Sequence, residues 1–216
     1  MKLFVWDFHG VLEKDNERAV IEISNRILET FGFKERFTQE DNLRLYGRKW
    51  FEYFEDLLPD EPHEVHLKLQ QACIKLEEDQ PHIVDNNIKP NDYAHEVLKA
   101  IRANRHDQIL ISNMSDVALN RSMAAVDVTD YFPPQKAFAC NTRDGSKVYT
   151  KHERLKTYLS GKQFERIIII GDTPNDISLA SIATGTTYLY VHPHLNFPNC
   201  KPTYKIRDLR EVLGEV

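Results

Sequence analysis

The sequence predicts a three-layer α/β fold with a parallel sheet and an inserted helical subdomain. Residues 3–6 are four apolar residues in a row without alternation, a pattern typical of a strand covered on both faces. Further apolar runs alternate with helical patterns along the chain, which predicts a parallel sheet with helices on its faces. Residues 14–85 have helical spacing and no strand pattern, and this block is too long for an ordinary connection between strands.

The helical block divides at its breaker residues. Residues 17–31 carry apolar side chains at helical spacing and end at Gly32, a plausible C-cap. Residues 38–58 predict one or two helices, opened by Thr38 as N-cap and interrupted around Gly47. A third helix is expected over residues 63–78, after the breaker at 59–62. We therefore predict a helical subdomain over 14–85 and a core formed by 1–13 and 86–216.

The rest of the core alternates between the two element types. Helices are expected at 90–101, 115–125, 151–159 (capped by Thr150), 176–183 (closed by Gly185) and 209–213, with a turn at 142–146. Strands are expected at 109–112, 137–140, 167–170 and 187–191.

Composition excludes several classes of protein. The 216 residues are 41% hydrophobic and carry a formal net charge of -5, which argues against a nucleic-acid binder. No apolar run approaches the about twenty residues of a membrane span. The three scattered cysteines and the absence of a signal-peptide pattern before the first strand favour reduced thiols in a cytoplasmic protein. A monomer and a homodimer both remain open.

Polar side chains follow three of the predicted strands. The first strand runs into Asp7, with His9 two residues later; the second runs into Ser112; the four isoleucines at 167–170 run into Asp172 and Asp176. Ligands of open α/β sheets bind outside the carboxyl ends of the strands. If the three strands lie side by side, these five residues meet in one crevice.

The residue types in this crevice suit phosphoryl chemistry. Three carboxylates could supply oxygen ligands to Mg²⁺, and they are too few for a dedicated Ca²⁺ site. Asp7 could attack phosphorus and form an aspartyl-phosphate. Ser112 would donate to phosphoryl oxygens, and a lysine would balance the charge of the carboxylates and the substrate.

These residues also resemble a known family. Residues 7–12, the pair Ser112 and Asn113, a lysine before the fourth strand, and residues 171–176 match, in order, the four motifs of the haloacid dehalogenase-like (HAD) superfamily. The resemblance covers the whole chain, and the helical block is similar to the C1-type cap of phosphoglycolate phosphatase and β-phosphoglucomutase relatives. Each motif alone is weak, but four in register are specific.

The resemblance implies a Rossmann-like core, a bound Mg²⁺ and a role for each motif residue. Asp7 would be the nucleophile and Ser112 would hold phosphate. The Mg²⁺ ligands would be an oxygen of Asp7, the main-chain carbonyl of His9, and an acid of motif four, Asp172 or Asp176.

His9 departs from the family pattern, in which phosphatases usually carry a second aspartate two residues after the nucleophile. That aspartate protonates the leaving alkoxide and then activates water. Histidine can do this work, since its unperturbed pKa is about 6.5. We predict a Mg²⁺-dependent phosphatase acting on a small phosphorylated substrate. The alternatives are a catalytically altered or inactive binding or regulatory protein, or a dehalogenase or phosphotransferase.

The lysine of the third motif has two candidates. Lys151 opens a predicted helix and is favoured over Lys147, which lies four residues earlier. In the helical block, Arg48 could reach a phosphate or another acidic group of the substrate, or could simply lie on a solvated helix face.

Several candidate residues also have simple structural explanations. Asn113 could bind substrate or only shape its loop. Asp172 could be a helix N-cap, and Asp176 a first-turn acid. His192, His194 and Cys200 match no zinc spacing, which favours a loop.

Overall fold

The computed structural model describes residues 1–46, 48, 50–141 and 149–216. They form two compact units, a core unit of residues 1–14 and 89–216 and a helical unit of residues 15–88. The sequence placed the boundaries of the helical block at residues 14 and 85. Among the described residues, no helix combines the length and the apolar character needed to cross a bilayer.

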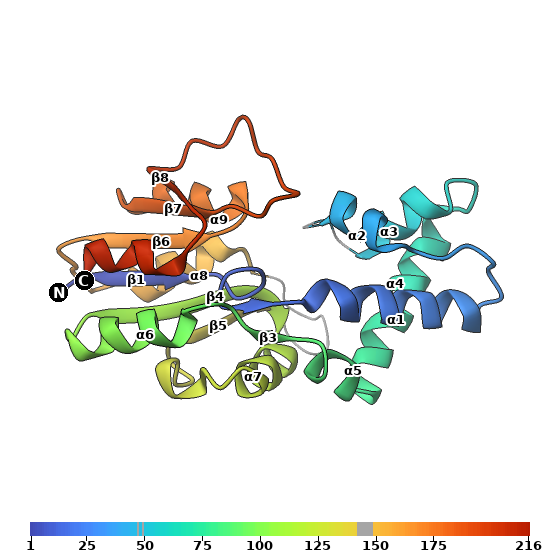
Figure 1. Ribbon diagram of the computed structural model, residues 1–216, viewed down its shortest axis with the longest axis horizontal. Coiled ribbons are helices and arrows are strands. Elements are labelled where there is room, and N and C mark those ends of the chain that lie inside the picture. The colour runs from blue at the N-terminus through green and yellow to red at the C-terminus, as the bar shows by residue number, and fades with distance from the viewer. Residues whose placement is uncertain (47, 49, 142–148) are drawn as a thin grey trace. The chain divides into compact units, whose positions relative to one another are not determined.

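A six-stranded sheet forms the centre of the core unit, in the order β5-β4-β1-β6-β7-β8 (Figure 1). Every neighbouring pair is parallel. The strands are β1 Leu3–Trp6, β4 Asp107–Ser115, β5 Ala137–Asn141, β6 Ile167–Gly171, β7 Thr186–Tyr190 and β8 Tyr204–Ile206. Trp6 at the end of β1 lies opposite Leu110 of β4 and Ile170 of β6. The three strands that the sequence marked for the site are therefore neighbours, as predicted.

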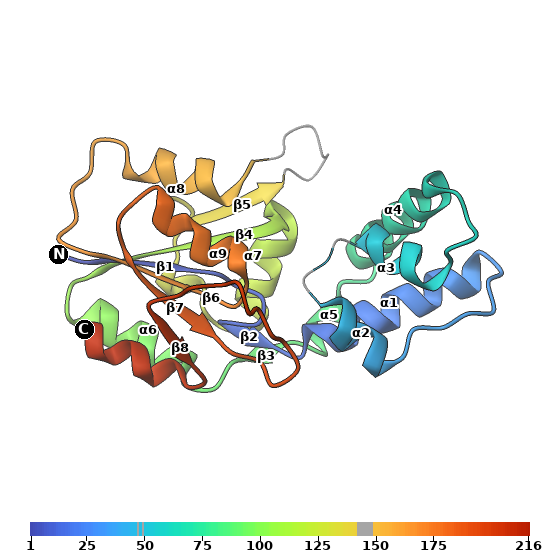
Figure 2. The ribbon, with the colours of Figure 1, turned by 90° about the horizontal axis from the view of Figure 1, so that it is seen from above.

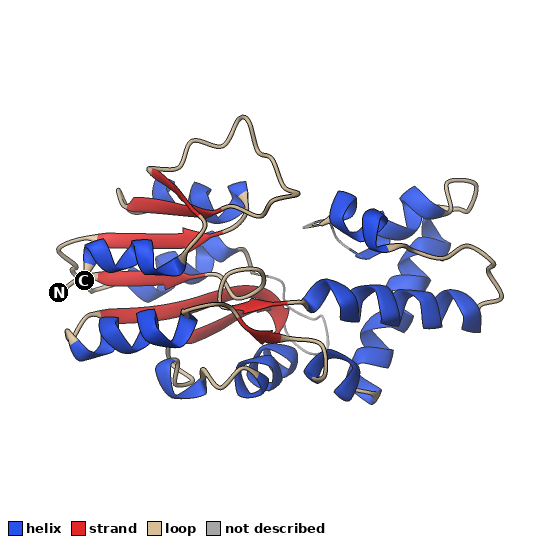
Figure 3. Ribbon diagram, viewed as in Figure 1, coloured by secondary structure: helices blue, strands red, loops and turns tan. Residues whose placement is uncertain are grey.

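Helices cover both faces of this sheet, which confirms the three-layer α/β class (Figures 2 and 3). On one face, Leu3 and Val5 of β1 pack in a buried cluster with Leu155 and Tyr158 of α8 (Lys151–Leu159). The alternate strand residues point to the opposite face, which α6 (Ala94–Ala103) and η3 (Leu209–Glu215) cover. The remaining core elements are α7 Asp116–Ala125, η1 Thr129–Tyr131, α9 Pro174–Ile177 and η2 Ser178–Ser181.

The described elements of the helical unit are all helices. Its elements are α1 Asn16–Thr30, α2 Gln39–Leu45, α3 Trp50–Leu57, α4 His63–Asp79 and α5 His82–Asp85. Thr38 caps α2 as expected, because its side chain accepts from the backbone of Asp41, which bonds back to Thr38. After α1, Gly32 adopts a φ of 82°, and its N–H bonds back to Glu29. The expected interruption at Gly47 lies outside the described residues.

A two-stranded antiparallel ladder lies in the core unit where the chain leaves it and returns. β2 (Glu13–Lys14) pairs with β3 (Lys89–Pro90), so that Lys14 lies opposite Lys89. Asn91 reinforces the ladder, because its backbone N–H donates to Leu12 and its side chain donates to Val11.

Several expected elements needed correction. The helix expected from residue 90 begins at Ala94, because residues 89–90 belong to β3. The strand expected to end at Ser112 continues through Ser115 with an irregularity between these two residues. The helix expected over 176–183 begins at Pro174 and gives way to η2 at Ser178. The tail helix expected at 209–213 is the 3-10 helix η3. β2, β3, β8 and α5 were not expected, since each is too short to show a period.

Candidate active site

The carboxyl edge of the central strands brings acids from two neighbouring strands together. Asp7 directly follows β1, and Asp172 and Asp176 follow β6. Parallel pairing continues past the end of β1, because the backbone N–H of Asp7 donates to Ile170 at 2.9 Å. The register of two strands thus sets the spacing of the acids.

Lys151 joins the two acidic segments. Its Nζ lies 2.6 Å from Oδ1 of Asp7 and 2.6 Å from Oδ1 of Asp176. The lysine is the first residue of α8, where Thr150 and Glu153 form a capping box that fixes the start of the helix. Lys151 was the lysine favoured from its helix-start position, and the alternative, Lys147, lies outside the described residues.

Asp176 is held through both carboxylate oxygens. Oδ1 accepts from Lys151, and Oδ2 accepts from the backbone N–H and the hydroxyl of Thr173 at 3.1 and 2.6 Å. The N-cap of α9 is Thr173, so the suggestion that Asp172 could be the cap is wrong, whereas Asp176 does lie in the first turn.

The site concentrates negative charge in a buried place. Burial raises the pKa of Asp7 to about 7. The negative charges of Asp176 and Asp172 raise this pKa further, whereas the positive charge of Lys151 lowers it. Burial disfavours the charged form of Lys151, but the attraction of Asp7 and Asp176 raises its pKa overall. The site therefore favours the binding of additional positive charge.

The acids fit a hard divalent cation. Oxygen atoms of Asp7, Asp172 and Asp176 lie within 4.8 Å of one another. Three carboxylates at this spacing, one after β1 and two after β6, are a donor set of the kind that Mg²⁺ prefers.

His9 is oriented by an acid that the sequence analysis passed over. Its Nδ1 lies 2.6 Å from Oε1 of Glu13, which also accepts from the backbone N–H of Gly10 at 3.3 Å. Glu13 is completely buried. Because a carboxylate only accepts, Nδ1 carries the hydrogen and Nε2 is the basic nitrogen of the neutral ring. In the sequence, Glu13 opened a polar stretch and had no signal that set it apart from a turn residue.

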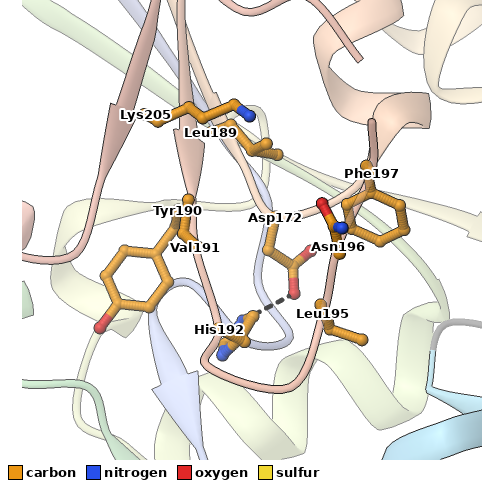
Figure 4. Close-up of a pocket in the computed structure, with 9 residues that line it drawn as sticks. All are labelled: Asp172, Leu189, Tyr190, Val191, His192, Leu195, Asn196, Phe197 and Lys205. Atoms are coloured by element: carbon orange, nitrogen blue, oxygen red, sulfur yellow. Dashed lines mark hydrogen bonds and ion pairs between the residues drawn. The ribbon is translucent and has the colours of Figure 1, made fainter. Parts of the chain in front are cut away.

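His192 contacts Asp172 from the neighbouring strand. It follows β7, and its Nε2 lies 3.1 Å from Oδ2 of Asp172 (Figure 4). The two side chains point toward one another at a small pocket whose other lining residues are Leu189, Tyr190, Val191, Leu195, Asn196, Phe197 and Lys205. The segment around His192 is a loop, as expected, yet this histidine belongs to the site. The sequence showed that His192 directly follows a predicted strand, but not that this strand is the neighbour of β6.

The remaining candidate residues have these positions. Ser112 is buried on β4, the other neighbour of β1, and its hydroxyl lies 3.5 Å from the backbone N–H of Met114. Asn113 follows it and is exposed. Arg48 is exposed and lies in the helical unit.

The fold and this set of motif residues define a haloacid dehalogenase-like hydrolase. The family model of that description matches residues 4–191, and the chain belongs to this family. No curated protein matches its sequence.

Solved structures share the fold at low sequence identity. A candidate phosphatase from Clostridium difficile is 16% identical, with a TM-score of 0.79 over 99% of this chain and 96% of the other. A predicted phosphoglycolate phosphatase from Haemophilus somnus is 16% identical, with a TM-score of 0.77 over 100% and 97%. A HAD family hydrolase from Deinococcus radiodurans with bound phosphate and sodium is 17% identical, with a TM-score of 0.67 over 99% and 94%.

Proposed function

We propose that the protein is a Mg²⁺-dependent phosphatase that hydrolyses a small phosphate ester through an aspartyl-phosphate on Asp7. The contact of Lys151 with both Asp7 and Asp176 carries this proposal, because it places a cation beside the proposed nucleophile at the carboxyl edge of the sheet. The phosphate bound by the Deinococcus radiodurans relative supports the substrate class.

Each residue has a role in the proposed reaction. A carboxylate oxygen of Asp7 forms a bond to phosphorus as the bond to the leaving alkoxide breaks, and the alkoxide takes a proton from His9. His9 then accepts a proton from water as the water attacks phosphorus and releases inorganic phosphate and free Asp7. Glu13 stabilises the positive charge that His9 carries in its protonated form.

Mg²⁺ would be held by Asp7, the main-chain carbonyl of His9 and an acid that follows β6. We assign the acid to Asp172 first, because both oxygens of Asp176 are engaged by Lys151 and Thr173. When bound, the ion neutralises charge on the phosphoryl oxygens.

Ser112 and Asn113 are proposed to hold the phosphoryl group. The helical unit is proposed to act as a cap, with Arg48 as a further contact of the substrate. The proposed substrate is a small molecule, and the proposed oligomeric state is a monomer or a homodimer. A cytoplasmic location is part of the proposal too, because all three cysteines are free thiols.

The test is a screen of metabolite phosphates with and without Mg²⁺ at several pH values, with phosphate release as the measurement. We expect turnover that requires Mg²⁺ and is abolished in Asp7→Asn. Absence of phosphate release from the whole panel, or equal release by Asp7→Asn, would refute the proposal.

A second candidate is a catalytically altered or inactive binding or regulatory protein, favoured by His9 in place of the family's usual aspartate. The variant His9→Asp separates the two. Loss of activity in this variant supports His9 as the acid and base, whereas a large gain from near zero supports a disabled site. Halide release or transfer of the phosphoryl group to a second substrate would instead indicate dehalogenase or phosphotransferase chemistry.

A further inference from the structure

A second group of metal-ligand side chains lies inside the helical unit, apart from the acids of the core. It consists of Glu55 on α3 and of His63 and His66 on α4, and ligand atoms of the three residues lie within 4.8 Å of one another. From this cluster we infer a site for a divalent transition-metal ion of the Zn²⁺ class, formed by the helical unit alone.

The local structure explains why the three side chains meet. His63 and His66 are three residues apart at the start of α4, a spacing that places both on one face of the helix. α3 packs along α4 within the helical unit, which brings Glu55 to that face (Figure 2). The ring of Phe51 meets the ring of His63 edge-on, with centroids 5.4 Å apart.

His66 supplies the observation that points to a ligand. It is 3% exposed, and its Nε2 lies 2.9 Å from the carbonyl oxygen of Leu58. A carbonyl only accepts, so Nε2 carries the hydrogen and Nδ1 keeps its lone pair. Within the described part of the chain, no hydrogen-bond partner reaches this buried Nδ1.

This arrangement is the one that metal-binding histidines have. Such a histidine donates from one ring nitrogen to a carbonyl or carboxylate, which orients the ring, and binds the metal through the other. A metal ion beside His66 would give Nδ1 the partner it lacks. A buried Nδ1 without a hydrogen-bond partner lowers the stability of the fold, whereas the same atom of a surface histidine bonds to water.

The other two residues are accessible to an ion from solvent. Nδ1 of His63 lies 2.6 Å from Oε1 of Glu55; His63 is exposed and Glu55 is partly exposed. A bound ion would exchange this hydrogen bond for bonds from each residue to the metal. Two bonds of about 2.1 Å at a tetrahedral angle separate their ligand atoms by roughly 3.4 Å, within the observed limit.

The ligand types and the surrounding charge select the ion. Two imidazoles and one carboxylate suit Zn²⁺ and its first-row neighbours, whereas Mg²⁺ and Ca²⁺ prefer oxygen alone. Residues 50–67 contain six acidic residues and no lysine or arginine. The resulting negative charge attracts cations to this part of the helical unit. Three protein ligands leave a coordination position for water.

The experiment uses the full chain without a histidine tag, stripped of metal, in the Asp7→Asn background so that the core acids are weakened as a competing site. Zn²⁺ binding is measured by titration calorimetry, and Co²⁺ binding by visible absorption, which reports tetrahedral coordination. We expect one Zn²⁺ per chain and a Co²⁺ spectrum with nitrogen and oxygen ligands. His63→Ala and Glu55→Gln should each weaken Zn²⁺ binding at least tenfold and remove the Co²⁺ bands.

The control variants are Glu64→Gln and His82→Ala, which change exposed residues of the same unit outside the cluster. They should bind Zn²⁺ as the parent does. His63 is exposed and Glu55 is partly exposed, so their variants test the site without replacing the buried His66. Absence of Zn²⁺ binding by the parent, or equal binding by His63→Ala and the parent, would overturn the inference. Neither outcome depends on phosphatase activity, so the inference stands or falls separately from the proposed function.

Discussion

A Cβ atom at Gly171 would lie 2.1 Å from the Cβ of Asp176. No real side chain tolerates this distance, so the last residue of β6 must be glycine for Asp176 to turn back toward Lys151. The close approach of the Asp176 side chain to the backbone of Gly171 thus links β6 directly to the geometry of the candidate site.

We predict that Gly171→Ala displaces Asp176 and, with it, Lys151. Overpacking of this kind costs about 1–3 kcal/mol in the free energy of unfolding, and a shift of about 1 Å in a catalytic group can lower activity by about a hundredfold. Phosphate release and urea unfolding measure the two effects. Gly214→Ala is the control, because its added Cβ would meet no atom of the described residues within 4 Å. Unchanged activity in Gly171→Ala would show that Asp176 has room to move without loss.

Glu13 is expected to support proton transfer by His9. We predict that Glu13→Gln lowers kcat by at least about tenfold with little change in KM, because a neutral amide stabilises a protonated imidazole less well than a carboxylate. Steady-state kinetics tests this, with Glu96→Gln on the surface of α6 as the matched control. A variant with the parent's kcat would leave Glu13 with a purely structural role.

His192 is expected to orient Asp172 toward the metal. Loss of such an outer contact typically weakens metal affinity or activity by about 10- to 100-fold. We therefore predict that His192→Ala raises the Mg²⁺ concentration needed for half-maximal activity by this factor. His106→Ala is the control, because His106 packs on Phe4 near the amino end of β1. An unchanged Mg²⁺ requirement in His192→Ala would contradict the prediction.

Asp107 gives the fold a pH-dependent contribution to stability. Burial works against its charge, but hydrogen bonds from Lys136, at 2.6 Å, and from the Tyr158 hydroxyl outweigh burial and lower the pKa of Asp107. A carboxyl group whose pKa is lower in the folded state stabilises the fold above its unfolded pKa of about 3.9, and this contribution is lost as the pH falls through the folded value.

At pH 7, Asp107→Asn should therefore lower the free energy of unfolding by about 1.5–3 kcal/mol, the usual value of hydrogen bonds to a charged group. The difference should shrink as the pH falls below about 4. Urea unfolding at a series of pH values measures it. Asp92→Asn breaks the exposed pair with Lys14 and should cost no more than about 1 kcal/mol. A difference between Asp107→Asn and the parent that does not vary with pH would contradict the assignment.

Sequence patterns predicted the features that depend on local chemistry. The apolar run of residues 3–6 became a strand buried on both faces, and Thr150 opened the helix that carries Lys151. Both follow from hydrophobic burial and helix capping, which act over a few residues.

The contacts that the sequence analysis missed depend on where strands lie in the sheet or on a single turn. His192 reaches Asp172, twenty residues earlier, because β7 is the neighbour of β6. Glu13 reaches His9 because residues 8–13 turn tightly, with the backbone of Leu12 and Glu13 bonded back to Phe8. Neither relation produces a period or a spacing that a single sequence shows.

The ladder between β2 and β3 also bears on how such a protein can change. Lys14 and Lys89 lie side by side, so the polypeptide departs from the core and rejoins it at a single point. A loop of a few residues that joined Lys14 directly to Lys89 would connect the two segments of the core unit without the intervening 74 residues (15–88). Evolution can therefore lengthen, shorten or replace that insertion while the sheet and its acids keep their register.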